Sequence, residues 1–174
     1  AAAFDPDPWL LNCDNGTLNL RISSLRGHDP PDLLTHVLPV PFDPEAPCPR
    51  WSSFLDQVFA GDQELIAFVQ RAVGYSLTGA TKEQCFFLLH GTGANGKSTF
   101  LEVLRALLGD LAHHADFGTF LQRDRDSVRN DIARLRGARL VTAVETDGDR
   151  PFAEAVLNVL TGGHTVARRF LYLQ

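Results

Sequence analysis

The sequence predicts an α/β fold on three observations. A short apolar run over residues 85–89 has the length and composition of a buried strand. A glycine-rich loop over residues 91–99 follows at once, and apolar side chains then recur at helical spacing over residues 100–108. A further apolar run over residues 138–145 predicts a second buried strand that delivers an acidic side chain at its carboxyl end. This alternation favours an α/β core over residues 81–174.

The region before that core is expected to begin with strands. Asp14-Asn15-Gly16 separates the apolar runs 9–13 and 17–21, and Asn-Gly between two such runs is the strongest short signal of a β-hairpin. Residues 35–40 are a further strand candidate. Pro39 places that strand at a sheet edge, because proline has no backbone N–H to donate.

A proline-rich linker and two helices are expected next. The prolines that recur between residues 30 and 49 predict an extended chain. Apolar side chains then keep one face over residues 51–59, and a second helical pattern ends near Gly79. Gly61 interrupts the pattern between the two helices. Residues 1–80 are therefore predicted to form a β-hairpin and a small helical region.

Two more helices are expected within the core. The first begins after Ser127 as its N-cap and ends at Gly137. The second begins at Pro151, a residue favoured in the first helical turn, and ends at residues 161–163.

The glycine-rich loop matches the pattern G-x-x-x-x-G-K-[ST], the phosphate-binding P-loop, or Walker A motif. Its glycines allow the backbone to curl with N–H groups facing inward, and a helix that starts there adds its positive end. Lys97 supplies charge for the outer phosphates of a nucleotide, and Ser98 supplies a hydroxyl for Mg²⁺. The alternative is a loop that only turns the chain. The predicted nucleotide-binding residues are Gly91, Thr92, Gly93, Ala94, Asn95, Gly96, Lys97, Ser98 and Thr99.

Hydrolysis also needs an acid near the Mg²⁺ and the attacking water. Glu145 ends the predicted strand over residues 138–145, and ligands of open α/β sheets bind at the carboxyl ends of strands. Glu145 is therefore the predicted catalytic acid and metal-site residue, with an ordinary surface glutamate as the alternative. Asp147 is a weaker metal-site candidate, because a turn aspartate before Gly148 explains it equally well.

The last residues hold the candidates for DNA contact. Arg168 and Arg169 follow Gly162-Gly163-His164 on a predicted hairpin, where their charges could meet DNA phosphates. A solvated arginine pair is an equally good explanation. His164 is a third candidate, and an ordinary polar loop residue is its alternative. No residue at metal-ligand spacing accompanies it.

Composition and charge limit the classes of function. The net charge of −5 argues weakly against a nucleic-acid partner, although arginine is concentrated in the last third of the chain. No apolar run approaches the roughly 18 residues of a membrane span, so no membrane partner is expected. The three cysteines are odd in number and lack C-x-x-C spacing, which favours a reducing cytoplasm.

Several segments, taken in order along the chain, resemble one family. The sequence is similar to the phage and plasmid primase–helicase family, whose motor is a superfamily III helicase domain. The segments that carry this resemblance are residues 4–7, 11–18, 65–79, 91–99, 130–135, 144–145, 160–163 and 167–172. Their shared order is more specific than the glycine-rich loop alone.

The resemblance implies a helicase-associated region over residues 1–80 and an AAA+-like core over residues 81–174 that lacks its C-terminal strands. It implies an enzyme that hydrolyses ATP, with Mg²⁺, to translocate on single-stranded DNA at a replication fork or origin. Such an enzyme forms an oligomeric ring, usually a hexamer, in the cytoplasm of a bacterial host of the phage, prophage or plasmid. Lys97 and Ser98 would correspond to the family's phosphate and Mg²⁺ ligands, and Glu145 to its Walker B acid.

The sequence departs from that family at two positions in the DNA-contacting part. His164 stands where the family usually has aspartate, and Asn158 stands where it usually has lysine. The chain also stops before the strand of the family's sensor asparagine and before its arginine finger. It contains no methionine, so we expect a piece of a longer polypeptide. Because an arginine finger contributes about 10³–10⁵ in rate, the piece is expected to bind ATP with little turnover.

Two other functions stay open. The chain could be a hydrolysis-deficient remnant or a nucleotide-sensing module whose main activity is oligomerisation through residues 1–80. It could also be a P-loop kinase of small molecules, although the β-rich N-terminal region and the resemblance count against that reading.

Overall fold

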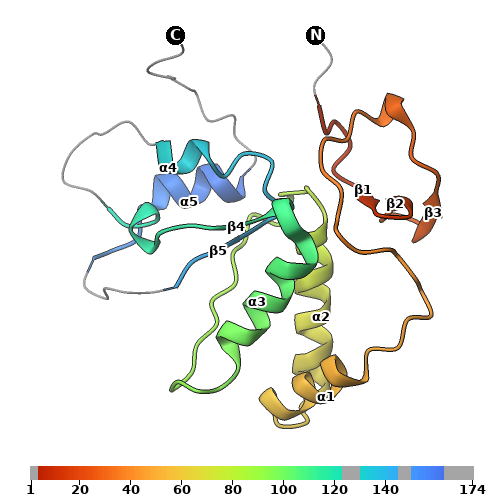
Figure 1. Cartoon of the computed structure of the whole chain (residues 1–174). Helices are drawn as coiled ribbons and strands as arrows, with labels where there is room; N and C mark the ends of the chain where they lie inside the picture. Colours follow the sequence, from red (N-terminus) through yellow and green to blue (C-terminus); the bar gives the residue numbers. More distant parts are fainter. Residues whose placement is uncertain (1–3, 123–129, 145–149, 163–174) are drawn as a thin grey trace.

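The computed structural model describes residues 4–122, 130–144 and 150–162 of the chain. Two helices, α2 (Gln63–Leu77) and α3 (Lys97–Leu108), pack together at its centre. A three-stranded sheet from the N-terminal part lies on one side of their upper ends, and a two-stranded sheet lies on the other (Figure 1). In the described parts, no helix combines the length and the apolar character that crossing a bilayer requires.

The predicted hairpin is confirmed. β1 (Leu10–Cys13) and β2 (Gly16–Asn19) are antiparallel, and the pairing of Cys13 with Gly16 leaves a two-residue loop between them. β3 (Ser24–Arg26), which the sequence did not predict, pairs with β2. A Cβ atom on Gly16 would collide with the backbone carbonyl oxygen of Arg26, so this close strand approach requires glycine.

The prediction of a strand over residues 35–40 is wrong, but the predicted position of this segment at a sheet edge is confirmed. The segment has no strand geometry, yet it runs along the free edge of β1. The Leu38 N–H donates to the Asn12 carbonyl at 2.8 Å, and the Asp14 N–H donates to the Val40 carbonyl at 3.0 Å. Pro39 and Pro41 have no N–H, so a longer ladder cannot form.

The two helices predicted after the linker are confirmed. α1 spans Pro49–Val58 and α2 spans Gln63–Leu77. Asp62 is the N-cap of α2, where its carboxylate accepts a hydrogen bond from the Leu65 N–H at 3.0 Å. Gly61, with φ +74°, provides the left-handed turn between the helices. The linker is not extended at its start, because residues Pro30–Asp32 form a 3₁₀ turn, η1.

Helix α3 joins two buried apolar clusters. At its C-terminal end, the hairpin cluster consists of Leu11, Cys13, Leu18, Leu38, Leu108 and Leu111. Nearer its N-terminal end, the helical cluster consists of Leu55, Ile66, Phe100 and Leu104. Each cluster combines side chains from before and after residue 80, so the packing is continuous across the expected boundary between the two regions.

The second sheet is small. β4 (Ala112–His114) and β5 (Leu140–Thr142) are parallel, and α3 packs beside both. β5 lies within the strand predicted over residues 138–145 but is shorter, and the sequence did not predict β4. Two 3₁₀ turns, η2 (Gly109–Leu111) and η3 (Phe117–Thr119), lie before and after β4.

Two short helices complete the described chain. α4 (Asn130–Ala133) lies within the helix predicted before Gly137, whose proposed N-cap, Ser127, is outside the described residues. α5 (Glu154–Thr161) begins three residues after Pro151, later than predicted. The backbone at Phe152 instead forms an antiparallel bridge with Leu121, which keeps this part of the chain extended.

Arg139 connects the hairpin to the helices. Its guanidinium donates to the Leu77 carbonyl at 2.6 Å, at the C-terminal end of α2, and to the Leu10 carbonyl in β1. Burial lowers the pKa of Arg139 from its ordinary value, and the carboxylates of Asp5 and Asp7 partly oppose that effect. These bonds satisfy a helix-end carbonyl that would otherwise lack a partner.

Candidate functional site

The strand predicted before the glycine-rich loop is absent from the structure. Residues 85–89 have no strand geometry, and the side chains of Phe86 and Leu88 are 54% and 74% exposed. The ring of Phe87 contacts Phe68 of α2 edge-on, with centroids 6.4 Å apart, and Phe86 lies near Phe152. A strand forms only where a neighbouring strand accepts its backbone hydrogen bonds, and among the described residues none pairs with this segment.

The glycine-rich loop itself ends where α3 begins. Gly93, Ala94 and Gly96 have positive φ angles of +97°, +47° and +81°, so the chain makes a tight left-handed turn before the helix. Gly96 is the N-cap of α3 and contributes no side-chain hydrogen bond, and the first turn of α3 holds no acidic residue. The amides of the first turn of α3 are therefore available to an anion, together with the positive end of the helix.

Lys97 closes the loop on itself. Its ammonium group donates to the Asn95 amide oxygen at 2.7 Å and to the Gly91 carbonyl at 3.1 Å. A Cβ atom on Gly91 would collide with the Asn95 amide nitrogen, so a side chain at this position would displace the amide that Lys97 contacts. A bound phosphate would take over hydrogen bonds that Lys97 now makes within the loop.

Helix α1 supports the loop from the side, a role that the sequence did not predict. A Cβ atom on Gly96 would lie 2.6 Å from a methyl carbon of Val58 and 3.2 Å from the ring of Phe54. The helical pattern marks α1 as an ordinary packing helix, and nothing local in the sequence connects it to a loop about 40 residues later. The contact with α1 explains why position 96 needs a glycine, since a Cβ atom there would clash with Val58.

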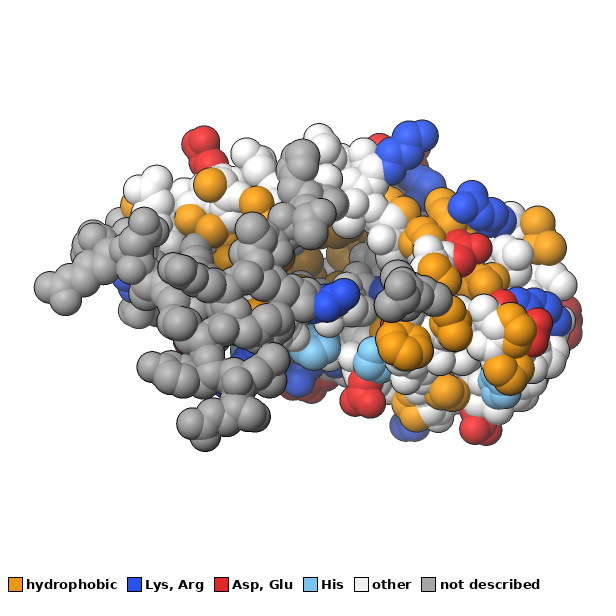
Figure 2. Space-filling model, turned by 90° about the horizontal axis from the view of Figure 1, so that it is seen from above, with side chains coloured by type: hydrophobic (Ala, Val, Ile, Leu, Met, Phe, Trp, Pro, Cys, Tyr) orange, Lys and Arg blue, Asp and Glu red, His pale blue; other side chains and the backbone are white. Residues whose placement is uncertain are grey.

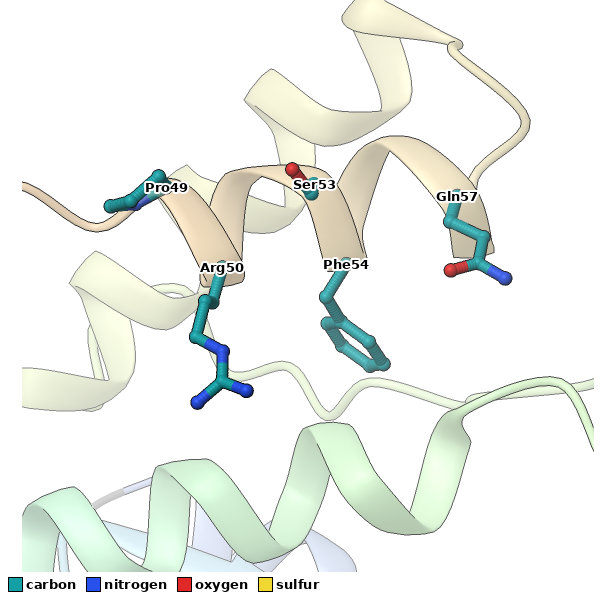
Figure 3. Close-up of a pocket in the computed structure, with 5 residues that line it drawn as sticks. All are labelled: Pro49, Arg50, Ser53, Phe54 and Gln57. Atoms are coloured by element: carbon teal, nitrogen blue, oxygen red, sulfur yellow. The ribbon is translucent and has the colours of Figure 1, made fainter.

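A shallow depression on α1 lies next to this contact. It is lined by Pro49, Arg50, Ser53, Phe54 and Gln57. Figure 3 shows Arg50 and Phe54 extending from the side of α1 that faces α3. The depression therefore adjoins the loop through Phe54, which contacts Gly96.

The remaining predicted site residues divide into two groups. Ser98 and Thr99 lie exposed in the first turn of α3, beside Lys97. Asn158 lies exposed on α5. Outside the described residues are the predicted catalytic acid, the weaker metal-site candidate and the DNA-contact candidates: Glu145, Asp147, His164, Arg168 and Arg169. The structure thus describes the glycine-rich loop and the start of α3, while the other half of the predicted site lies outside the described residues.

The described residues offer no cluster of metal ligands, and the face shown in Figure 2 carries no basic stripe on its coloured part. In the part of the chain that the structure describes, three or more His, Cys, Asp or Glu side chains nowhere gather as metal ligands. On the face shown in Figure 2, the coloured part carries Lys and Arg, Asp and Glu, and hydrophobic side chains interspersed, with no continuous basic stripe. The glycine-rich loop is therefore the strongest candidate site on the described chain.

Two comparisons with known proteins bear on this site. Residues 1–60 match the protein-family model described as D5 N terminal like, which covers the hairpin, the linker and α1. Over 175 residues, the chain is 26% identical to a protein of Acanthamoeba polyphaga mimivirus named "Putative helicase L207/L206". That match covers 97% of this chain and includes the glycine-rich loop, but the chain spans only 18% of the length of the viral protein. The chain is thus similar to a protein named as a helicase, and its first 60 residues fit the D5 N-terminal-like pattern.

Proposed function

We propose that this chain is the ATP-binding core of a DNA helicase of phage or plasmid replication, with an AAA+-like, superfamily III motor. The observation that carries the proposal is the glycine-rich loop at the start of α3, where Lys97 and uncapped helix amides converge. The similarity to a helicase-named viral protein extends over this loop and supports the same reading.

The residues present fit a nucleoside triphosphate. The loop offers backbone amides, one ammonium group and the positive end of a helix of 12 residues, with no acidic side chain in its first turn. In the proposal, Lys97 exchanges its bonds to Gly91 and Asn95 for bonds to the outer phosphates. Ser98, exposed beside it, would hold Mg²⁺ together with Glu145. Mg²⁺ supplies neutralisation of the phosphate charge, and Glu145 would orient the attacking water.

Motor activity is the further part of the proposal. Hydrolysis would drive translocation on single-stranded DNA at a fork or origin, in an oligomeric ring that we expect to be a hexamer. His164, Arg168 and Arg169 would contact the DNA phosphates. The similarity to the helicase-named viral protein and to the D5 N-terminal-like family supports this part.

Isothermal titration calorimetry with Mg-ATP tests the nucleotide site. We expect Lys97→Ala to weaken binding by about 10- to 100-fold, because it removes hydrogen bonds between a charged group and phosphate. Lys82, the other lysine of the chain and an exposed one, provides the matched control Lys82→Ala, which should leave affinity unchanged. Tight binding that Lys97→Ala does not alter would contradict the proposed site.

A second function, a nucleotide-sensing module without turnover, is favoured by one observation. Lys97 already has two acceptors within the loop, so its ammonium group has hydrogen-bond partners without a nucleotide. This function predicts nucleotide binding that changes oligomeric state, with no hydrolysis. ATP turnover that is stimulated by single-stranded DNA and abolished by Glu145→Gln would exclude it.

A further inference from the structure

The depression on α1 adjoins the loop through a single aromatic ring. The edge of the Phe54 ring approaches Gly96, the residue before Lys97, so the two features share a wall. Arg50, Phe54 and Gln57 are spaced four and three residues apart and therefore lie on one side of α1. A molecule held by its phosphates in the loop could extend along this side of the helix.

Phe54 is the last ring of an aromatic row. Its ring stacks on Trp51 with centroids 5.5 Å apart and an interplanar angle of 25°. Trp51 in turn stacks on Phe100 of α3 at 5.6 Å and 17°. Trp51 stacks on Phe54 and the Phe54 ring also lines the depression, so a ligand there would meet the part of the ring that Trp51 leaves free. A row fixed in this way presents a rigid, flat platform for another ring.

Polar groups surround this platform. Arg50, Ser53 and Gln57 are exposed, and Arg50 has no ion-pair partner among the described residues. Arg50 and Gln57 extend from the same side of α1 as Phe54, so a guanidinium and an amide flank the aromatic ring (Figure 3). This combination suits a heterocyclic base with its sugar, because a base stacks on the ring while its edge and the sugar hydroxyls need hydrogen-bond partners.

We propose that the depression on α1 binds the base and ribose of the nucleotide whose phosphates the glycine-rich loop holds. The inference rests on the proposed function, because the loop must first bind the phosphates. Phe54 provides the stacking surface, and Arg50 and Gln57 donate to the ribose and the base edge. The first helical segment after the linker is thereby a part of the nucleotide site.

Calorimetry with two ligands, Mg-ATP and Mg-tripolyphosphate, tests the inference on the 174-residue chain. Phe54→Leu keeps an apolar side chain in α1 but removes the stacking face, and we expect it to weaken Mg-ATP binding by about ten-fold. Tripolyphosphate affinity should not change, because it has no base. Gln57→Ala, at an exposed position, should weaken Mg-ATP binding a few-fold and also spare tripolyphosphate. Phe68→Leu, at a half-exposed aromatic of α2, is the control expected to change neither affinity.

The possible failures are distinguishable. If the unaltered chain binds neither ligand, the proposed function fails and this inference fails with it. If both ligands bind and Phe54→Leu leaves Mg-ATP affinity unchanged, the base lies elsewhere while the loop assignment stands. If Phe54→Leu weakens the binding of both ligands equally, Phe54 acts only by supporting Gly96. That result would also contradict the proposed base-binding site.

Discussion

The two ends of α3 differ in burial and in the contacts that hold them. Its C-terminal end lies in the hairpin cluster, where Leu108 is only 2% exposed and Gly109 closes the helix by donating its N–H to the Arg105 carbonyl. Its N-terminal end carries an exposed loop whose polar groups are held by few contacts, chiefly those of Lys97 and Gly96. One end of the helix is anchored by apolar burial, and the other keeps donors available for a ligand.

The hairpin contributes to the candidate site indirectly, through α3. Most of the stability of a helix in a protein comes from tertiary packing, so packing elsewhere on α3 can support its exposed, uncapped N-terminal end. The hairpin and residues 38–42 cover the far end of α3, and α1 covers the near end beside Gly96. Substitutions at the anchored end should therefore act on stability, and those at the open end mainly on binding.

The largest effect is expected at the anchored end. Leu108→Ala should lower the free energy of unfolding by about 2–5 kcal/mol, because it leaves a cavity among buried side chains. The neighbouring Leu107, 37% exposed on the same helix, provides the control Leu107→Ala, with an expected loss below about 1 kcal/mol. Urea unfolding followed by circular dichroism measures both. Equal losses for the two variants would show that this end of α3 is not anchored.

A smaller effect is expected at the connection between the hairpin and α2. Arg139→Gln should destabilise by about 1.5–3 kcal/mol, because it removes charged hydrogen bonds to the carbonyls of Leu10 and Leu77. Arg136→Gln, at an exposed position three residues earlier, should have no measurable effect. Thermal unfolding of the two variants measures the difference. If Arg139→Gln unfolds at the same midpoint temperature as the unaltered chain, Arg139 does not stabilise the connection between the hairpin and α2.

The smallest effect on stability is expected at the open end. Gly96→Ala should cost about 1–2 kcal/mol, because the residue has a positive φ and its Cβ would meet Val58. Gly93 also has a positive φ, but a Cβ atom there would meet no atom within 4 Å. Gly93→Ala should therefore lower the free energy of unfolding by less than Gly96→Ala. Adding Val58→Ala to Gly96→Ala should recover part of the loss in a double-mutant cycle. Strict additivity of the two substitutions would show that α1 does not press on the loop.

The predictable parts of the fold are those that local sequence determines. Asn15-Gly16 between apolar runs predicted the hairpin, and apolar periodicity interrupted by Gly61 predicted α1 and α2. Residues 35–40 and 85–89 were wrongly predicted as strands, because a strand depends on a hydrogen-bonding neighbour that its own residues do not specify. The three-residue strands β3 and β4 were too short for any periodic signal.

The position of the candidate site was predictable from the sequence, its surroundings were not, and its chemistry stays a prediction. The spacing of Gly91, Gly96 and Lys97 located the loop, and the structure places it at the start of α3. The contact between Gly96 and α1 joins residues far apart in the chain, so no short pattern could predict it. The roles assigned to Glu145 and to the DNA-contact residues stay predictions, because those residues lie outside the described chain.

Hydrogen exchange followed by mass spectrometry, with and without Mg-ATP, tests the contrast between the two ends of α3 most directly. Mg-ATP should slow exchange at the amides of residues 91–100, where the loop and the first turn of α3 would bind phosphate. It should leave exchange at the amides of β1 and β2 unchanged, and Lys97→Ala should raise the Mg-ATP concentration needed for protection by about 10- to 100-fold. Unchanged exchange over residues 91–100 at saturating Mg-ATP, or equal protection in the loop and the hairpin, would contradict a nucleotide site at the open end of this helix.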